Sequence, residues 1–464
     1  MTLRSTDSAI LRGTHTSFTL AAILLVAIVL RIWGAAWAWP YGFWGDEALY
    51  MPNAFRMLAD RDFNTHSFHN SHLLTYVYCA EIAVAFVVLA GLGVTSTPAA
   101  FGTFVWRHTP AFQLLGRVTV GLSGAVTVFF LFRFAKPLFG QRAALLSAWF
   151  LAVSFLHTRN SHIAVNDVPM TMFLVIAATS SFGLVDSPSF RRSVLAGVGT
   201  GLAIGTKYNA GVFLLVPVAA LAMSCLTRDS VSRFVRFARL RGVLRLTAYT
   251  VVVCLVAAGV FVLSNPFSVL SFSEFWAGFT RQVSYGASPW PTQSPQPVAW
   301  QLLSALHYGL GIPVLVFALI GSAMALRTSP RYGLLLILFV CAYLLAMGRQ
   351  SLFFPRFVIP ALPFVCTLAG IGADAIVRTV TIQVSAIGAI GRWCCATSPT
   401  IVTVVVAAIG GGPALARSVY LDALLTRPTT QQLTIDWFES RQQPVPLIVG
   451  EYDTIGGYGA SLSF

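Results

Sequence analysis

Long apolar segments alternate with short polar ones along almost the whole chain, and each has roughly the twenty residues that a helix needs to cross a bilayer. These segments are continuous and rich in Leu, Val and Ala, whereas the strands of a membrane β-barrel alternate in polarity from one residue to the next. The pattern therefore predicts an all-α polytopic membrane protein.

Lys and Arg between the apolar segments give each predicted span a direction, because basic residues are enriched in cytoplasmic loops. We place the N-terminus (1–17), the segment around Arg133 and the basic segment 228–245 in the cytoplasm. Two apolar segments, 72–94 and 112–132, precede Arg133. If both of them crossed the membrane, Arg133 would lie outside, so only one of the two is expected to span.

The segment 72–94 is the one that we predict not to span, because its first half carries polar aromatic residues, His72 and Glu81 and suits an interfacial or re-entrant helix. The predicted organisation is a cytoplasmic N-terminus (1–17), a transmembrane domain (18–416) with a long first extracytoplasmic loop (41–111), and a short extracytoplasmic tail (417–464). About eleven spans are expected, at 18–39, 112–132, 143–157, 168–185, 194–206, 210–226, 246–264, 301–326, 332–348, 357–377 and 397–416.

Composition agrees with this class of protein. Hydrophobic residues make up 56% of the 464 residues, and 30 basic against 16 acidic residues give a net charge of +14. The basic residues lie in short loops rather than on one soluble face, so cytoplasmic loops and anionic lipid explain them better than nucleic acid does. The seven cysteines show no metal-finger spacing and indicate neither a disulfide framework nor a zinc site.

Five charged residues fall on the same predicted outer side, although only the basic loops were used to assign the sides: Asp46, Glu47, Asp167, Lys207 and Arg356. Charged groups beside or within a bilayer are costly to desolvate, so a membrane protein that keeps them usually pairs or uses them. Structural alternatives remain. The acids suit helix N-termini, the long side chain of the lysine can reach the interface, and the arginine can bind lipid head groups.

His66, His69 and His72 are spaced by three residues, which raises the question of a zinc site. On a helix the third histidine drifts away from the face of the first two, and no acidic partner is evident. We therefore predict no metal ligands. The cofactor stays unknown, and a divalent metal is compatible with the sequence but not implied by it.

Six motifs occur in a characteristic order: Gly45 to Tyr50, Phe68 to Leu73, Gly116-Arg117, Ser161 to Pro169, Gly205 to Tyr208, and Arg356 to Pro363. Their order, spacing and common side resemble the lipid-phosphate-sugar-dependent GT-C glycosyltransferases, in particular the protein O-mannosyltransferase and aminoarabinose transferase branch. The resemblance covers roughly residues 18 to 440. Two features depart from that pattern: Asn70-Ser71 stands where the family usually has Pro-Pro, and the C-terminal soluble domain of many members is nearly absent.

The resemblance implies a GT-C transmembrane helix bundle in the cell (plasma) membrane with an extracytoplasmic active site. Its implied reaction is transfer of a sugar, with inversion, from a polyprenyl-phosphate donor to a protein, lipid or cell-envelope glycan. Asp46 is then the general base, with Glu47 and Asp167 as further acidic residues of the site. The residues expected to bind the lipid phosphate or the sugar are Lys207, Tyr208, Arg356, Arg159, His162 and Tyr285.

A transporter or flippase of a lipid-linked or small substrate is the main alternative, because many spans with a few buried charges also describe that class. Such proteins usually contain two similar halves with broken helices near the midplane of the membrane. The chain shows no evident internal repeat, and its charged motifs gather on one side. A structural or assembly subunit is a third alternative, and it leaves the positions of Asp46 and Lys207 unexplained.

Overall fold

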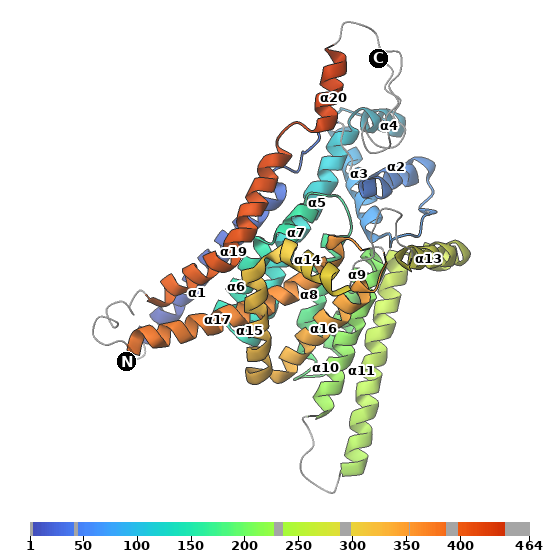
Figure 1. The fold of residues 1–464 in the computed structure, drawn as a ribbon. Coiled ribbons are helices and arrows are strands. Elements are labelled where there is room, and N and C mark those ends of the chain that lie inside the picture. The colour runs from blue at the N-terminus through green and yellow to red at the C-terminus, as the bar shows by residue number, and fades with distance from the viewer. Residues whose placement is uncertain are drawn as a thin grey trace.

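The computed structural model describes residues 3–40, 45–226, 235–287, 298–351, 353–386 and 398–440. Over these residues the chain is helical and contains no strand, which confirms the predicted all-α class (Figure 1). Of the outer tail, 417–440 is described, and 441–464 lies outside the described residues.

The first half of the chain builds the segments around the charged motifs. Its elements are α1 (Leu3–Ile32), η1 (Gly45–Leu49), α2 (Met51–Asp60), α3 (Leu73–Gly91), α4 (Pro98–Arg107), α5 (Thr109–Phe139), α6 (Gln141–Ala152), α7 (Phe155–Ser161), α8 (Asp167–Gly183), α9 (Phe190–Thr206), η2 (Tyr208–Leu214) and α10 (Leu215–Leu226). The second half contains α11 (Val235–Ser264), α12 (Phe267–Leu270), α13 (Phe272–Ala287), α14 (Val298–Leu310), α15 (Ile312–Thr328), α16 (Pro330–Gly348), η3 (Pro355–Ala361), α17 (Leu362–Ala386), α19 (Ser398–Leu425) and α20 (Thr430–Glu439).

Six helical segments of the described chain are long and apolar enough to cross a membrane, or seven if the bent pair α14 and α15 forms one span. Several predicted spans are shorter or interrupted. The segment 143–157, for example, is divided between α6 and α7, and α14 meets α15 at an angle of 108°. The count of about eleven spans therefore stays a prediction.

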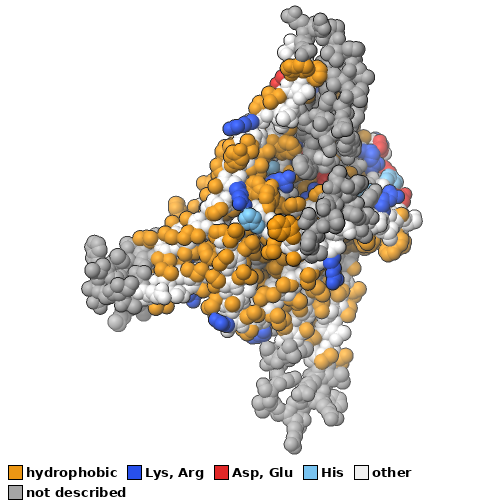
Figure 2. Space-filling model, viewed as in Figure 1, with side chains coloured by type: hydrophobic (Ala, Val, Ile, Leu, Met, Phe, Trp, Pro, Cys, Tyr) orange, Lys and Arg blue, Asp and Glu red, His pale blue; other side chains and the backbone are white. Residues whose placement is uncertain are grey.

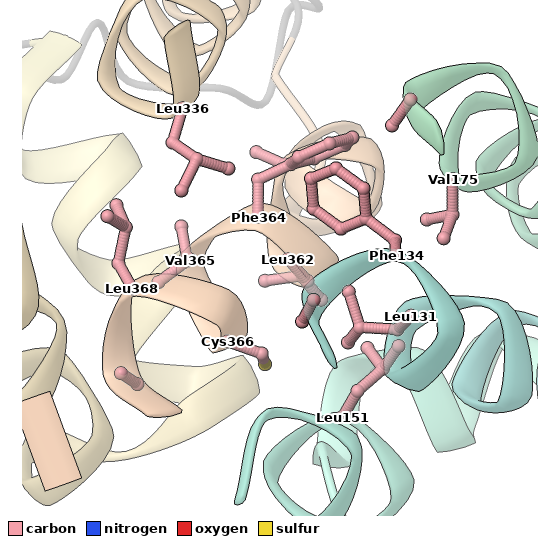
Figure 3. Packing of buried hydrophobic residues seen from close by; sticks show 14 of the residues in the cluster. Leu131, Phe134, Leu151, Val175, Leu336, Leu362, Phe364, Val365, Cys366 and Leu368 are labelled. Carbon is pink, nitrogen blue, oxygen red and sulfur yellow. The ribbon is translucent and has the colours of Figure 1, made fainter. Parts of the chain in front are cut away.

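The core lies where α5, α6, α8, α16 and α17 meet (Figure 3). Helix α17 is the most enclosed of the candidate spans, since 94% of the residues in its most apolar stretch are buried. It packs directly on α15 through glycines: a Cβ atom on Gly321 would lie 1.8 Å from the Leu368 carbonyl oxygen, and one on Gly372 would lie 2.0 Å from that of Phe317. Small residues let membrane helices approach until their backbones touch, and here nothing larger than glycine fits.

One end of this bundle, which we call the site end, gathers the end of α1, the start of α8, the end of α9 and the start of α17. Helix α3 begins there, where the His72 backbone N–H donates to Asn265 Oδ1 at 2.6 Å. From the ends of α9 and α11 it leads away toward α4 and α20 (Figure 1). Its length and composition suit a span, so its predicted interfacial position stays a prediction.

Hydrophobic side chains cover most of the face seen in Figure 2, and acidic, basic and histidine side chains gather near α2 and α13. Large apolar side chains such as Leu255 on α11, Leu319 on α15 and Val404 on α19 are more than half exposed. Surfaces of this composition suit contact with lipid rather than water, as expected for a multi-pass membrane protein.

Candidate active site

Asp46 and Glu47 lie together in η1, and Glu47 is completely buried. Arg117 of α5 binds the Glu47 carboxylate with two nitrogens, Nε to Oε1 at 2.9 Å and Nη2 to Oε2 at 2.8 Å. The backbone N–H of Ala164 also donates to Oε1, at 2.7 Å. These bonds satisfy a charge that water does not reach, so Glu47 anchors η1 to α5 and to the segment before α8.

Arg117 also holds the segment that precedes η1. Its Nη1 donates to the carbonyl oxygens of Trp37, at 2.8 Å, and Ala35, at 3.3 Å. Its guanidinium carbon lies 4.1 Å from the centroid of the Trp37 ring, a cation–π contact. One arginine therefore fixes the chain on both sides of residues 41–44. Its position in the Gly116-Arg117 motif was noted from the sequence, but no role was predicted for it.

Asp46 differs from its neighbour because 39% of its side chain is exposed. It forms an ion pair with Arg356 of η3, whose guanidinium also lies 5.1 Å from the ring centroid of Phe354. Asp46 is thus the carboxylate of η1 that a substrate can reach.

Asp167 and Lys207 form a second ion pair, with 2.6 Å between Nζ and Oδ1. Asp167 is the first residue of α8 and is buried, while Lys207 lies between α9 and η2. The Lys207 ammonium is 5.6 Å from the ring centroid of Phe357, the residue that follows Arg356. Lys207, the charged residue that the sequence places in an apolar segment, is therefore paired with Asp167 within the protein, and its side chain does not reach out to the membrane interface.

Tyr50 lies near both ion pairs. It is buried directly after η1. Burial raises the pKa of the Tyr50 phenol well above its ordinary value, and the nearby carboxylates of Asp167 and Asp46 raise it further. The two ion pairs belong to a single charged site because Lys207 lies against the ring of Phe357, which directly follows Arg356, and Tyr50 stays protonated beside them.

An open cleft of about 440 Å³ adjoins this site. Lys207 and Phe357 line it, and α13 and α16 complete its walls. Tyr208 also lines it, and its hydroxyl donates to the carbonyl oxygens of Asn70, at 3.3 Å, and Phe68, at 3.4 Å. Arg349, Gln350 and His69 add polar groups that were not predicted as site residues. The cleft thus combines cations with aromatic and aliphatic walls, which suits a phosphate joined to a long apolar chain.

Three further predicted residues lie differently. His162 is buried away from the cleft, and its ring nitrogens contact the carbonyl oxygens of Thr158, at 3.0 Å, and Trp33, at 2.8 Å. Arg159 is half-buried on α7 and does not line the cleft. Tyr285 belongs to α13, but its side chain lies outside the described residues.

Of the three histidines considered for zinc, His66 lies between two acids, with Nε2 at 2.8 Å from Asp62 and Nδ1 at 3.0 Å from Glu274. Hydrogen bonds to these acids raise the pKa of His66, and a backbone hydrogen bond followed by the bond to His66 lowers the pKa of Asp62. Within the described ranges, no three His, Cys, Asp or Glu residues are placed to hold a metal ion.

Comparison with known proteins places these residues in a recognised fold. Residues 113–253 match the family model described as dolichyl-phosphate-mannose-protein mannosyltransferase. A comparison with curated protein sequences finds no match. The chain is similar to apo ArnT from Cupriavidus metallidurans, with a TM-score of 0.54 and 16% identity over 89% of this chain and 77% of that one. For ArnT bound to undecaprenyl phosphate the TM-score and identity are the same, and 88% of this chain and 77% of that one are covered.

It is also similar to the archaeal oligosaccharyltransferase AglB from Archaeoglobus fulgidus in complex with an inhibitory peptide and a dolichol-phosphate. The TM-score is 0.55 and the identity 14%, over 94% of this chain and 60% of that one. The chain therefore spans about three fifths of the length of AglB. The shared fold and the family-model match confirm the resemblance to the GT-C group and the predicted enzyme class, a glycosyltransferase.

Proposed function

We propose that the chain transfers a sugar from a polyprenyl-phosphate carrier to an acceptor hydroxyl at the extracytoplasmic face of the cell membrane, with inversion at the anomeric carbon. The observation that carries the proposal is that Asp46, a carboxylate that a substrate can reach, forms an ion pair with Arg356. Arg356 directly precedes Phe357, which lines the cleft together with Lys207 of the second ion pair. Undecaprenyl phosphate and dolichol-phosphate bound to the ArnT and AglB relatives support a carrier of this kind.

The donor phosphate occupies the cleft at Lys207. Its negative charge competes with Asp167 for the ammonium and with Asp46 for Arg356, so binding of the donor releases the Asp46 carboxylate from its ion pair. Phosphate is a good leaving group when cations stabilise it, so the reaction needs no carboxylic acid to protonate it.

Asp46 then acts as the general base. It takes the proton of the acceptor hydroxyl while the hydroxyl oxygen forms its bond to the anomeric carbon. The bond between that carbon and the phosphate oxygen breaks, and its electron pair stays on the polyprenyl phosphate beside Lys207 and Arg356. Glu47 takes no part in this transfer, because Arg117 and Ala164 occupy its carboxylate; it positions Asp46.

The test is a transfer assay with the purified protein in lipid nanodiscs and radiolabelled polyprenyl-phosphate sugars. We expect Asp46→Asn to lower the transfer rate by roughly 10²- to 10⁴-fold, the range associated with a general base. Asp60→Asn is the matched control, because Asp60 is also an exposed acid paired with an arginine near the site end. Equal rates for Asp46→Asn and wild type would exclude Asp46 as the base. Substrate transport in liposomes without sugar transfer would favour the transporter instead.

A further inference from the structure

His162 does not line the cleft, yet it is among the most enclosed polar residues beside the site, with 1% of its surface exposed. It directly follows α7 and lies two residues before Ala164, whose backbone N–H binds Glu47. A substrate in the cleft does not reach this side chain. His162 can therefore act on the site only through the backbone groups that it binds.

Two reciprocal hydrogen bonds join His162 to the segment that follows α1. Its Nε2 lies 2.8 Å from the carbonyl oxygen of Trp33, and because a carbonyl oxygen only accepts hydrogen bonds, Nε2 is the donor. In return, the His162 carbonyl oxygen accepts from Nε1 of Trp37, at 3.0 Å. One residue at the end of α7 thus holds the segment 33–37 at both of its ends.

These contacts continue through Arg117 and return to the end of α7. The Arg117 guanidinium carbon lies 4.1 Å from the centroid of the Trp37 ring, and its Nη1 donates to the Trp37 carbonyl oxygen. Arg117 binds Glu47 with two nitrogens, and Glu47 accepts from the N–H of Ala164, two residues after His162. The contacts form a closed ring, which we call the His162 ring, and it includes the neighbour of the proposed base.

The helices around His162 are closely packed. A Cβ atom on Gly124 of α5 would lie 2.7 Å from Oγ of Ser161 and 2.9 Å from Cδ of Arg31, so only glycine lets α1, α5 and α7 meet there. From α19, Oδ1 of the buried Asp422 lies 3.4 Å from His162 Nε2. The place of His162 is therefore set by the packing of four helices.

We propose that His162 is a positioning residue for the reaction, and that the His162 ring holds η1 where Asp46 can reach the acceptor hydroxyl. This inference rests on the proposed function and deepens it. Asp46 is partly exposed and its ion pair joins it to a residue of the site, so its backbone is placed through Glu47. A general base must lie within hydrogen-bond reach of the proton that it takes, and a displacement of about 1 Å can lower the rate roughly 10²-fold.

The first experiment compares Trp37→Phe with Trp149→Phe in the full chain in nanodiscs, by transfer from radiolabelled polyprenyl-phosphate sugars. Trp37→Phe keeps a ring beside Arg117 and removes the N–H that binds the His162 carbonyl oxygen. We expect kcat to fall roughly five- to tenfold, with the KM for the donor changed by less than about twofold. Trp149 is the matched control, because its Nε1 donates to the Ala407 carbonyl oxygen at the same 3.0 Å but outside the His162 ring. Trp149→Phe should transfer as wild type.

The second experiment separates the two bonds of the His162 side chain. In His162→Gln the longer side chain brings an amide N–H to the place of Nε2, which binds Trp33. In His162→Asn the shorter one brings it to the place of Nδ1, which lies 3.0 Å from the Thr158 carbonyl oxygen within α7. We expect His162→Gln to keep kcat within about threefold of wild type and His162→Asn to lose roughly 10²-fold. Thermal unfolding of each variant shows whether it is folded, and Trp37→Phe tests the ring without altering the imidazole.

Three results would overturn this inference alone, provided that the wild type transfers sugar. They are a wild-type kcat in Trp37→Phe, an equal loss in Trp149→Phe, and a loss in His162→Gln as large as that in His162→Asn. A higher KM for the donor in place of a lower kcat would show that the ring acts on donor binding, and would also overturn it. If the wild type transfers no sugar from any donor, the proposed function fails and the inference fails with it.

Discussion

The two adjacent acids of η1 meet two different regions of the protein. Glu47 faces the interior, is fully buried, and is held by Arg117 and a backbone N–H. Asp46 faces the site, keeps 39% of its side chain exposed, and has Arg356 as its one ion-pair partner among the described residues. The two carboxylates thus differ in role: Glu47 stabilises the fold, and Asp46 is the one that we propose takes part in the reaction. Burial and the number of partners, rather than residue type, distinguish the two roles.

Replacement of Glu47 by Gln gives the largest expected effect on stability. It leaves the guanidinium of Arg117 buried without its counter-charge, and loss of one member of a buried ion pair costs about 3–5 kcal/mol. Thermal unfolding of the purified variant measures this loss. A variant as stable as wild type would show that Glu47 is not the anchor, and the comparison between the two acids would break down.

Lys207→Gln tests the other of the two regions, the charged site that Asp46 faces. A hydrogen bond to a charged partner contributes about 1.5–3 kcal/mol, so the affinity for polyprenyl phosphate should fall roughly 10- to 100-fold. Lys136→Gln is the control, because Lys136 is exposed at the opposite end of α5. The affinity is measured by titrating nanodiscs with a fluorescent polyprenyl phosphate. An unchanged value would remove Lys207 from the phosphate site.

Asp46→Asn should have little effect in the unfolding measurement used for Glu47. A partly exposed ion pair contributes roughly 0–1 kcal/mol, so the free energy of unfolding should change by no more than that. A loss as large as that of Glu47→Gln would mean that Asp46 is also a structural anchor, and any loss of transfer in this variant would then need another explanation.

Replacement of the exposed residue His66 should have the smallest effect on stability, and this effect should depend on pH. Its pKa is raised above the ordinary 6.5, so its stabilising contribution is complete below that pH and is lost as the pH rises through the raised value. The pKa of Asp62 is lowered from 3.8, so its contribution is lost only as the pH falls through the lowered value.

The contribution of this exposed pair should therefore be largest at mildly acidic pH. We expect the difference in Tm between wild type and His66→Ala to be greatest near pH 5 to 6, roughly between the two ordinary values and below the raised one, and to shrink as the pH rises through the raised pKa of His66. His108→Ala, an exposed histidine on α4's end without an acidic partner among the described residues, serves as the control. A constant difference across this range would contradict the assignment.

Sequence reasoning predicted much of this arrangement. Segment length and the position of basic loops gave a helical membrane bundle, and the sides assigned to Asp46, Asp167, Lys207 and Arg356 agree with their meeting at one end of it. It did not identify their partners. Arg117 is 70 residues from Glu47, and neither periodicity nor spacing relates residues so far apart. The cleft residue Arg349 directly follows the predicted span 332–348 and was not recognised as a site residue.

The sequence also did not predict which buried polar residues on different helices contact one another. Arg31 of α1 lies 3.1 Å from His157 of α7, and His162 lies 3.4 Å from Asp422 of α19. Arg31 and Asp422 appear in the sequence as isolated charged residues in apolar segments, and His157 and His162 are the two ends of one polar segment. Which of these residues pair depends on how the helices cross. Glycines in the sequence indicate that helices pack closely, but they do not show which helix is the neighbour.

The enclosure of α17 also bears on how the protein assembles during synthesis. This helix touches α15 through backbone at Gly321 and Gly372, and it packs on α6 and α19 as well. Its neighbours come from both earlier and later parts of the chain. Inserted helices first exist separately in the bilayer and then associate, so the side of α17 that α19 covers stays open to lipid until α19 has entered the membrane. Final closure of the bundle therefore awaits synthesis of α19, and a shortened product that ends before α19 would leave one side of its central helix uncovered.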